Sequence, residues 1–257
     1  MKDLKRIFQC LLPYRKPFIL AVLFVVVETS FELIIPMIMA DIIDVGGEST
    51  RPGHVQIGDE EEIKRVVPVI REIKKKFDIP VSIDTYKSAV AKAALEAGAD
   101  LLNDIWGFRY DEKMAELAAE YDVPVCLMHN RDNLDYDDFM EDVKKDLQIS
   151  LDIAEKYGVK KENIMLDPGV GFGKTYEQNL MVMNHLEEIV DMGYPVLLGT
   201  SRKSVIGLTL DLPVDEREEG TLATSVLGAI KGCQFVRVHD VEKNVRALKM
   251  TDAILHS

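Results

Sequence analysis

The sequence predicts an α/β fold, a TIM (β/α)8-type barrel, and three observations lead to that prediction. First, seven short apolar runs each end on a polar or charged residue. Buried parallel strands read as such runs, and a barrel of this type carries its chemistry where the strands end. Second, a stretch with helical periodicity follows each run. Third, a length of 257 residues suits one such barrel.

The elements alternate regularly from residue 40 onward. The predicted strands cover residues 40–46, 79–85, 99–105, 124–129, 163–169, 195–201 and 235–240. The predicted helices cover residues 59–76, 87–97, 111–121, 137–157, 175–191, 215–231 and 242–254. Several helices begin with acidic and end with basic residues, as the helix dipole favours. We therefore interpret residues 40–257 as one barrel domain.

The first 39 residues form a hydrophobic N-terminal segment that stands in place of the first strand, loop and helix of a barrel. Residues 1–40 hold five Lys or Arg and three Asp or Glu, whereas the whole chain has a formal charge of −13. Three interpretations compete. They are a membrane helix over 17–40 with its basic flank inside, a secretory signal, and a barrel strand over 18–27 followed by a covering helix over 28–39.

Charge and cysteine usage exclude some classes of function. A net charge of −13 argues against a nucleic-acid partner, because phosphate contacts need clustered Lys and Arg. Cys10, Cys126 and Cys233 are far apart and form neither a CxxC motif nor an even framework. We expect reduced thiols in a cytoplasmic protein, with membrane association through residues 17–40 as the alternative.

The loop after the first predicted strand combines glycines with a hydroxyl and a cation. Glycines permit tight turns and close approach of a ligand, and Thr50 and Arg51 follow them at the barrel mouth. An arginine guanidinium pairs well with phosphate oxygens. A capped loop between strand and helix would explain the glycines but not Arg51.

Three carboxylates and an amide end three further predicted strands: Asp84, Asn103 with Asp104, and Asp167. A carboxylate accepts hydrogen bonds and an amide both donates and accepts, so together they suit a flat heterocycle with ring N–H and amino groups. Each of them alone is equally typical of a helix N-cap. Their equivalent places at several strand ends favour a binding site.

The segment 167–175 resembles a phosphate-binding loop superficially. Its spacing between the first glycine and Gly-Lys-Thr is one residue short of the Walker pattern. We instead expect its glycines to build a turn through which Phe172 and the backbone close on a ligand.

Cations follow the last two predicted strands. Arg202 and Lys203 directly follow the strand predicted over 195–201. Arg237 and His239 alternate with valines on the strand predicted over 235–240, so their side chains point to the same side. Together they predict a polyanion clamp, with salt bridges to the many carboxylates as the alternative. The Gly-x-Ser at 199–201 lacks the second glycine of a nucleophile elbow, and no Ser–His pairing in the sequence supports hydrolase chemistry.

His129 ends the fourth predicted strand, and its expected role is a hydrogen bond to a neighbour.

Taken together, these segments resemble the dihydropteroate synthases of folate biosynthesis over residues 40–257. The motifs that resemble that family, in its order, are 41–53, 82–85, 103–105, 127–131, 167–174, 201–204 and 237–240. The resemblance implies a transferase that joins 6-hydroxymethyl-7,8-dihydropterin diphosphate to 4-aminobenzoate and releases diphosphate. It also implies Mg²⁺ as a cofactor and a homodimer.

The resemblance also implies roles for individual residues. Asp84, Asn103, Asp167 and Lys203 are expected to hold the pterin, and Asp84, Asp167 and Lys203 are the catalytic candidates. Arg237 and His239 are expected to hold the diphosphate. Thr50, Arg51, Phe172 and Ser204 are expected on the 4-aminobenzoate side.

Residues 1–39 depart from that family. They lack its Asn-Val-Thr-Pro-Asp-Ser-Phe loop, whose Asn is the expected Mg²⁺ ligand, so we expect no protein metal ligand and impaired turnover. They instead resemble the first membrane helix of an ATP-binding-cassette exporter, which suggests a chimera joined at 40–46. Two other readings stay open: a pterin-dependent methyltransferase domain, which has no use for a diphosphate clamp, and a non-catalytic pterin-binding or membrane-attached fusion product.

Overall fold

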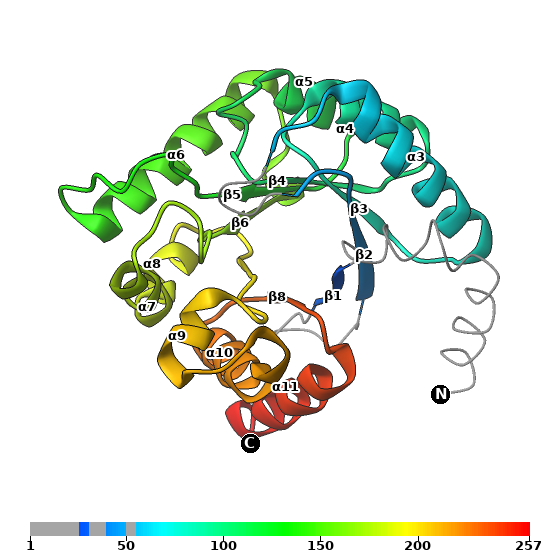
Figure 1. Ribbon diagram of the computed structural model, residues 1–257. Coiled ribbons are helices and arrows are strands. Elements are labelled where there is room, and N and C mark those ends of the chain that lie inside the picture. The colour runs from blue at the N-terminus through cyan, green and yellow to red at the C-terminus, as the bar shows by residue number, and fades with distance from the viewer. Residues whose placement is uncertain (1–25, 31–39, 50–54) are drawn as a thin grey trace.

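A ring of helices surrounds a barrel of strands in the computed structural model (Figure 1), which describes residues 26–30, 40–49 and 55–257. The described strands are β1 (Val26–Ser30), β2 (Ala40–Gly46), β3 (Val81–Asp84), β4 (Leu101–Asp104), β5 (Val125–Met128), β6 (Ile164–Asp167), β7 (Leu197–Leu198) and β8 (Phe235–Val238). Each of the seven predicted runs contains one strand from β2 to β8, which confirms the predicted alternation.

The strands follow the order β6-β5-β4-β3-β2-β1-β8-β7 in one sheet. Neighbours from β2 to β6 are parallel, and so are β7 and β8. A parallel bridge between Leu166 of β6 and Val196, next to β7, joins the two ends of this order. The sheet therefore closes into a barrel, as the sequence predicted.

The first strand of the barrel differs from the prediction. β1 occupies Val26–Ser30. The predicted strand over 18–27 therefore agrees with the structure at its two described residues, 26 and 27, whereas the predicted helix from residue 28 is wrong at 28–30, which continue the strand. β1 runs antiparallel to both β2 and β8. A connection of nine residues is shorter than the crossover of about a dozen or more that a parallel pair needs, but it can join an antiparallel pair. The nine residues 31–39 between β1 and β2 therefore impose the antiparallel direction.

The remaining predictions on the N-terminal segment concern residues 1–25 and 31–39, which lie outside the described residues. They include most of the membrane interpretation over 17–40 and the exporter-like chimera. Within the described ranges, no helix combines the length and apolar character needed to cross a bilayer.

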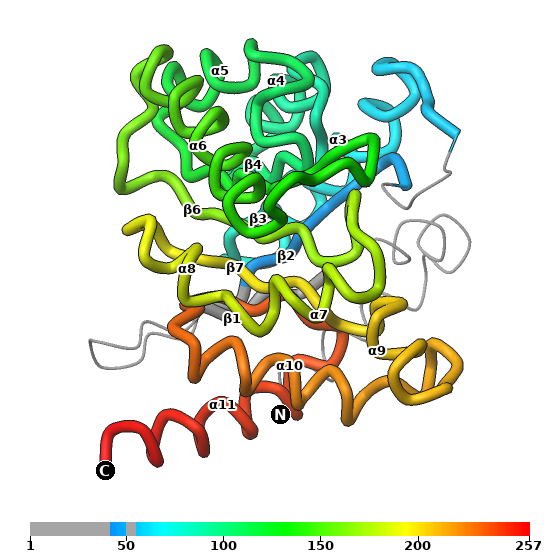
Figure 2. Tube along the Cα trace, turned by 90° about the vertical axis from the view of Figure 1, so that its left-hand side faces the viewer, coloured from blue at the N-terminus to red at the C-terminus, as the bar shows by residue number. Residues whose placement is uncertain are grey.

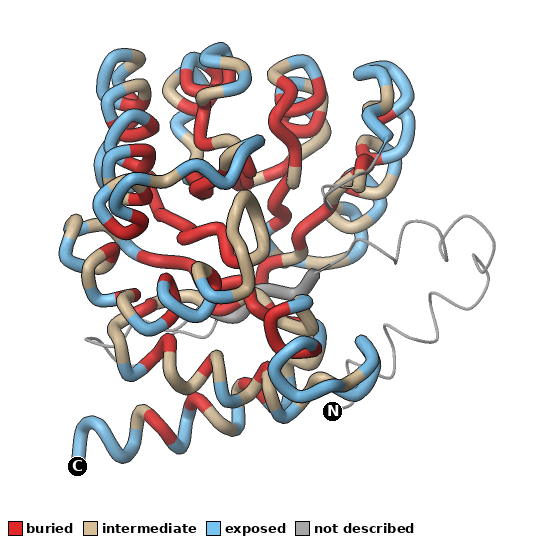
Figure 3. The backbone as a smooth tube through the Cα atoms, turned by 60° about the vertical axis from the view of Figure 1, so that its left-hand side comes forward, coloured by how far each residue is buried: buried red, intermediate tan, exposed pale blue. Residues whose placement is uncertain are grey.

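Nine described α-helices cover the outside of the barrel (Figure 1). They are α3 (Asp59–Lys76), α4 (Ser88–Glu96), α5 (Lys113–Tyr121), α6 (Phe139–Tyr157), α7 (Tyr176–Asn184), α8 (Leu186–Val190), α9 (Ser204–Leu210), α10 (Glu218–Ile230) and α11 (Val241–Leu255). In the side view of Figure 2, α3 to α6 lie on one side of the strands and α9 to α11 on the other. Figure 3 shows the buried residues on the strands and on the helix faces that pack against them.

Two helices differ from the predicted pattern. The predicted helix over 175–191 is divided into α7 and α8, because His185 between them has a non-helical backbone with φ −118° and ψ 30°. The short helix α9 was not predicted at all. Its seven residues are too few for a periodic apolar pattern to stand out.

The barrel interior is layered because side chains alternate along each strand. An apolar cluster of Leu101, Cys126, Met165 and Leu197, joined by Phe235, fills one level. Two positions further along β4, β6 and β8, on the same side, stand Asn103, Asp167 and Arg237. The interior therefore changes from apolar to polar at the carboxyl ends of the strands.

Candidate active site

A polar layer occupies the carboxyl ends of the barrel strands, and we define it by Asp44, Asp84, Asn103, Asp167 and Arg237. Asp44, Asn103 and Asp167 are buried, while Asp84 and Arg237 are partly buried. The side chains come from β2, β3, β4, β6 and β8. The barrel thus brings together strand-end residues that are up to 193 positions apart in the chain.

Three carboxylate oxygens of the polar layer are buried and have no hydrogen-bond partner among the described residues: Asp44 Oδ1, Asp84 Oδ1 and Asp167 Oδ2. Buried polar atoms are normally paired, because an unpaired one keeps its full desolvation cost. Burial first, and then the charge of Asp44, raises the pKa of Asp84 to about 8. A ligand that brings N–H donors would relieve both costs.

Asp44 connects the two halves of the polar layer. Asn103 Nδ2 donates to Asp44 Oδ2 at 3.1 Å, and Arg237 Nη1 lies 3.4 Å from the same oxygen. Since a carboxylate only accepts, the Asn103 amide turns its nitrogen toward Asp44 and keeps its carbonyl for other donors. Sequence reasoning did not propose Asp44 as a site residue, although its inward position two residues before Gly46 was the available signal.

Lys203 approaches the polar layer from the loop after β7. Its Nζ donates to the carbonyl of Val170 and lies 4.8 Å from the centroid of the Phe172 ring. Desolvation lowers the pKa of Lys203 to about 8, although the charge of Asp167 opposes that shift. The charges of Asp84 and Arg237 also act on Lys203. The structure therefore gathers the pterin-side and diphosphate-side candidates in one electrostatic neighbourhood.

His239 and Ser201 form a pair beside this layer. His239 Nδ1 lies 2.8 Å from Ser201 Oγ, and the backbone N–H of His239 donates to the same oxygen at 3.1 Å. Sequence reasoning did not propose this contact, because its two residues lie 38 positions apart. Ser204, the first residue of α9, is exposed next to Lys203.

The loop after β6 is a turn built on glycines, as predicted. Gly169, Gly171 and Gly173 all have a left-handed backbone, with φ of 66°, 87° and 54°. A Cβ on Gly169 would lie 1.8 Å from the His129 carbonyl oxygen, and one on Gly173 would lie 2.6 Å from that of Arg131. Only glycine fits against the neighbouring loop at these two positions.

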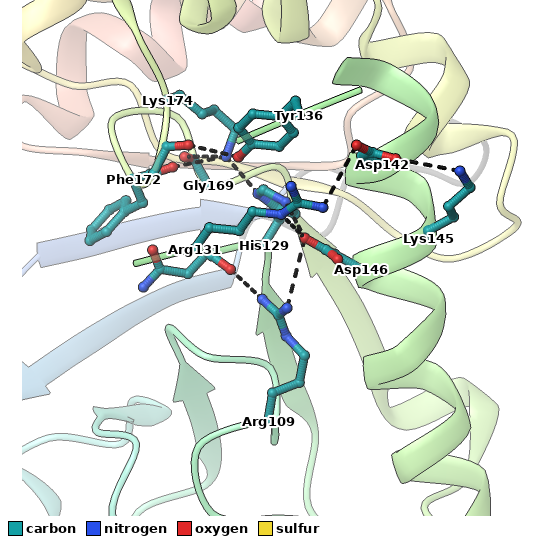
Figure 4. A network of polar contacts seen from close by, with 12 residues as sticks. Arg109, His129, Arg131, Tyr136, Asp142, Lys145, Asp146, Gly169, Phe172 and Lys174 are labelled. Atoms are coloured by element: carbon teal, nitrogen blue, oxygen red, sulfur yellow. Dashed lines mark hydrogen bonds and ion pairs between the residues drawn. The ribbon is translucent and has the colours of Figure 1, made fainter. Parts of the chain in front are cut away.

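A buried polar network joins that loop to β5 and α6 (Figure 4). His129 Nε2 lies 3.1 Å from Asp146 Oδ2, and Arg131 Nε donates to the same oxygen at 2.6 Å. On its other side, His129 Nδ1 lies 2.7 Å from Lys174 Nζ. Burial tends to raise the pKa of Asp146, but the bonds from His129 and Arg131 hold it well below its usual range. The expectation that His129 bonds a neighbour is confirmed.

A second buried network lies beneath the loop after β2. Lys87 Nζ is 2.6 Å from Glu48 Oε2 and 2.8 Å from Glu62 Oε2. Tyr86 donates to Glu48 at 2.6 Å, and Thr85 to Glu62 at 3.0 Å. Burial lowers the pKa of Lys87, but the two carboxylates raise it overall. Sequence reasoning missed this network, because only the fold brings Glu48, Glu62 and Lys87 together.

Two predicted residues and the predicted metal cannot be placed in this geometry. Thr50 and Arg51 lie in 50–54, outside the described residues. Within the described ranges, no three His, Cys, Asp or Glu side chains gather as metal ligands would.

Comparisons with known proteins agree with this geometry. The family model of the pterin-binding enzymes matches residues 39–239. The chain is 66% identical over 217 residues to the dihydropteroate synthase of Clostridium beijerinckii, covering 84% of this chain and 81% of that one. It is 55% identical to that of Bacillus subtilis, covering 84% of this chain and 76% of that one.

Solved structures give the same result. The dihydropteroate synthase of Clostridium difficile, determined in the presence of pteroic acid, is 55% identical with a TM-score of 0.81, covering 83% of this chain and 81% of that one. The Xanthomonas albilineans enzyme with 4-aminobenzoic acid is 38% identical with a TM-score of 0.80, covering 84% and 80%.

Proposed function

Since the chain belongs to the dihydropteroate synthase family of pterin-binding enzymes, we propose that its polar layer is the site of that family's transfer reaction. The substrates are 6-hydroxymethyl-7,8-dihydropterin diphosphate and 4-aminobenzoate, and the products are 7,8-dihydropteroate and diphosphate. Relatives determined with pteroic acid and with 4-aminobenzoic acid support this choice.

The observation that carries the proposal is the set of unpartnered carboxylate oxygens on Asp44, Asp84 and Asp167. A reduced pterin has ring N–H groups and an amino group in one plane. These donors match buried acceptors that the described residues leave without partners, and the Asn103 carbonyl adds another acceptor. The proposal assigns the pterin to Asp84, Asn103, Asp167 and Lys203, with Asp44 as a further contact.

Positively charged side chains bind the diphosphate leaving group in this proposal. Lys203 and Arg237 both lie at the polar layer, and His239 stands beside it with Ser201. When the C–O bond to the diphosphate breaks, its electron pair leaves with the diphosphate oxygen. Fixed positive charges at that oxygen stabilise the transition state more than the ground state. Arg237 also contacts Asp44, so the diphosphate and pterin parts of the site share one carboxylate.

The pterin methylene carbon that loses the diphosphate gains positive charge, and the pterin ring delocalises this charge. The buried carboxylate of Asp167 favours that charge, and Asp84 does so in its ionised form, because electrostatic interactions strengthen where water is excluded. The amine nitrogen of 4-aminobenzoate then forms the new C–N bond with its lone pair and releases one proton to the departing diphosphate or to water. We assign Thr50, Arg51, Phe172 and Ser204 to the aminobenzoate side.

Magnesium enters the proposal only as an ion carried by the diphosphate. The described side chains do not form a metal-binding site of three or more His, Cys, Asp or Glu ligands. Mg²⁺ usually keeps several waters and binds through substrate phosphates together with one or two carboxylates. We derive no step through it.

Turnover below that of other family members, a homodimer, and a chimeric or membrane-associated N-terminal segment all remain part of the proposal. We expect the lower turnover because the sequence of residues 1–39 contains no asparagine and no Asn-Val-Thr-Pro-Asp-Ser-Phe motif.

Incubation of the purified chain with both substrates tests the function. Dihydropteroate and diphosphate should form in equal amounts, and calorimetric titration should show that the pterin diphosphate binds more tightly with Mg²⁺ than without it. Failure of the protein to bind any pterin would overturn the proposal. Binding without turnover would instead favour the non-catalytic alternative.

A further inference from the structure

The network of Figure 4 contacts the candidate site through the loop of residues 168–174 and through the backbone N–H of His129, which donates to the Asp167 carbonyl at 2.9 Å. His129, Asp146 and Lys174 have no direct part in the transfer reaction proposed above. His129 is buried, and Asp146 is held by Arg131 from the far side. The question is what this arrangement of charged groups does behind the site.

The hydrogen bonds of the network have one direction. Where Lys174 Nζ donates to His129 Nδ1, the proton of the neutral ring is on Nε2 and is given to Asp146. Burial lowers the pKa of Lys174 well below its usual range, although the charge of Asp167 opposes that shift. Burial, reinforced by the charge of Lys174, lowers the pKa of His129 to about 4, which keeps the ring neutral. The ring thus links one fixed donor to one fixed acceptor.

Lys174 holds the loop by its backbone. Its Nζ donates to the carbonyls of Gly169 and Phe172, both at 3.0 Å. Tyr136 adds a bond from its hydroxyl to the Gly173 carbonyl at 2.7 Å, and the guanidinium carbon of Arg131 lies 4.2 Å from the centroid of the Tyr136 ring. Three carbonyls of one short loop are therefore bonded: two by Lys174 of the same loop, whose Nζ also contacts His129 after β5, and one by Tyr136.

The same loop supplies both contacts of the Lys203 ammonium group described above: the Val170 carbonyl and the Phe172 ring. We propose that His129 and Lys174 are positioning residues, which hold the loop 168–174 so that Val170 and Phe172 place Lys203 at the polar layer. The consequence for pterin binding rests on the proposed function.

Simple space filling does not account for this arrangement. Lys174 makes its bonds to a neutral ring nitrogen and two carbonyls, and it has no ion pair among the described residues. A buried lysine amine held by neutral acceptors is costly compared with an apolar side chain of the same volume. What Lys174 Nζ does supply is hydrogen bonds to two carbonyls of its own loop and a contact to the His129 ring.

Two His129 variants separate positioning from packing. In His129→Gln, an amide can accept from Lys174 with its oxygen and donate to Asp146 with its nitrogen. His129→Leu fills a similar volume but makes neither bond. Lys174→Met removes the three Nζ contacts, and Lys92→Met, on an exposed position of α4, is the matched control for that substitution.

Hydrogen exchange of the ligand-free protein provides the direct readout. The backbone N–H groups of Gly169, Gly171 and Phe172 are bonded to Asp167, Asn179 and Gly169, respectively. We expect the peptide covering them to exchange about tenfold or more faster in His129→Leu and Lys174→Met, as loss of one or two hydrogen bonds implies. His129→Gln and Lys92→Met should exchange as the parent does.

Affinity for pteroic acid, measured by calorimetry, tests the link to Lys203. His129→Leu and Lys174→Met should bind about tenfold or more weakly, while His129→Gln stays within about threefold of the parent. If His129→Leu and His129→Gln show the same loop exchange and the same affinity, the inference is wrong. This comparison decides the matter even if Lys174→Met does not fold. If the parent itself binds no pterin, the proposed function fails, and loop exchange alone still decides whether His129 and Lys174 position the loop.

Discussion

Lys87 and Lys203 stand after strands β3 and β7 of the same barrel, yet their surroundings are opposite. Lys87 lies between two carboxylates, Glu48 and Glu62, and its pKa is raised although burial opposes this. Lys203 contacts a carbonyl and an aromatic ring, and desolvation lowers its pKa to about 8. The fold itself balances the first charge, whereas the second remains to be balanced by a ligand.

The carboxylates show the same contrast. Glu48 and Glu62 each accept hydrogen bonds from resident side chains. Asp84 Oδ1 and Asp167 Oδ2 have no partner among the described residues. The buried charged groups of this protein are thus of two kinds. Those of Lys87, Glu48 and Glu62 are paired with one another and stabilise a loop, whereas those of Lys203, Asp84 and Asp167 are available to bind a substrate. Four substitutions test this distinction.

The largest effect is expected for the balanced network. Lys87→Met would leave Glu48 and Glu62 buried without their shared cation, which should cost about 3–5 kcal/mol of unfolding free energy. Urea denaturation measures it. A loss below about 1 kcal/mol would contradict the view that this charge is structural. Replacing both glutamates by glutamine in the Lys87→Met background should restore part of the stability.

The unbalanced lysine should behave in the opposite way. Lys203→Met is expected to lower kcat/KM by about 10²–10³-fold, because a cation that stabilises the leaving group is lost. Its urea midpoint should stay close to that of the parent, since no resident carboxylate loses a partner. Diphosphate release under steady-state conditions measures the first effect. If Lys203→Met kept full activity, or were as unstable as Lys87→Met, the distinction between a structural and a substrate-binding lysine would be wrong.

Asp84 should make stability depend on pH in a predictable sense. Its pKa of about 8 in the folded chain lies above the ordinary value of 3.8, so between about pH 4 and pH 8 the folded state binds more proton than the unfolded state. Its contribution to stability is therefore lost as the pH rises through that window.

The variant Asp84→Asn should abolish this part of the decline. Between pH 5 and pH 8, the unfolding free energy of the parent should fall by at least about 1 kcal/mol more than that of the variant, the equivalent of about one pKa unit. Thermal or urea unfolding at several pH values gives the comparison. Parallel pH profiles would show that the Asp84 carboxyl is not perturbed.

The smallest effect is expected for Asp44, which has one carboxylate oxygen with partners and one without. Its Oδ2 is contacted by Asn103 and Arg237, while its Oδ1 has no partner among the described residues. Asp44→Asn should weaken pteroic acid binding by about fivefold to tenfold, roughly one hydrogen bond. Calorimetry measures it, with Ser88→Ala on α4 as a control. Unchanged affinity would show that Asp44 does not orient the Asn103 amide.

The predictable part of this protein follows from local rules. Apolar runs with polar ends predicted β2 to β8, and the helix over 59–76 matches α3. The strand-end residues Asp84, Asn103 and Asp167 were identifiable because parallel strands in a barrel end at one face. The direction of β1 was not, since it depends on pairing with β2 and β8 and on a short connection.

The sequence by itself determined the barrel and the polar character of its strand ends, because strand periodicity and βα alternation are properties of neighbouring residues. Only the tertiary structure decided which charges cancel. Lys87 meets Glu48 across 39 positions, and Lys174 meets His129 across 45. Electrostatic energy depends on distances in space and on the water removed by packing, and neither can be read from the order of residues along the chain.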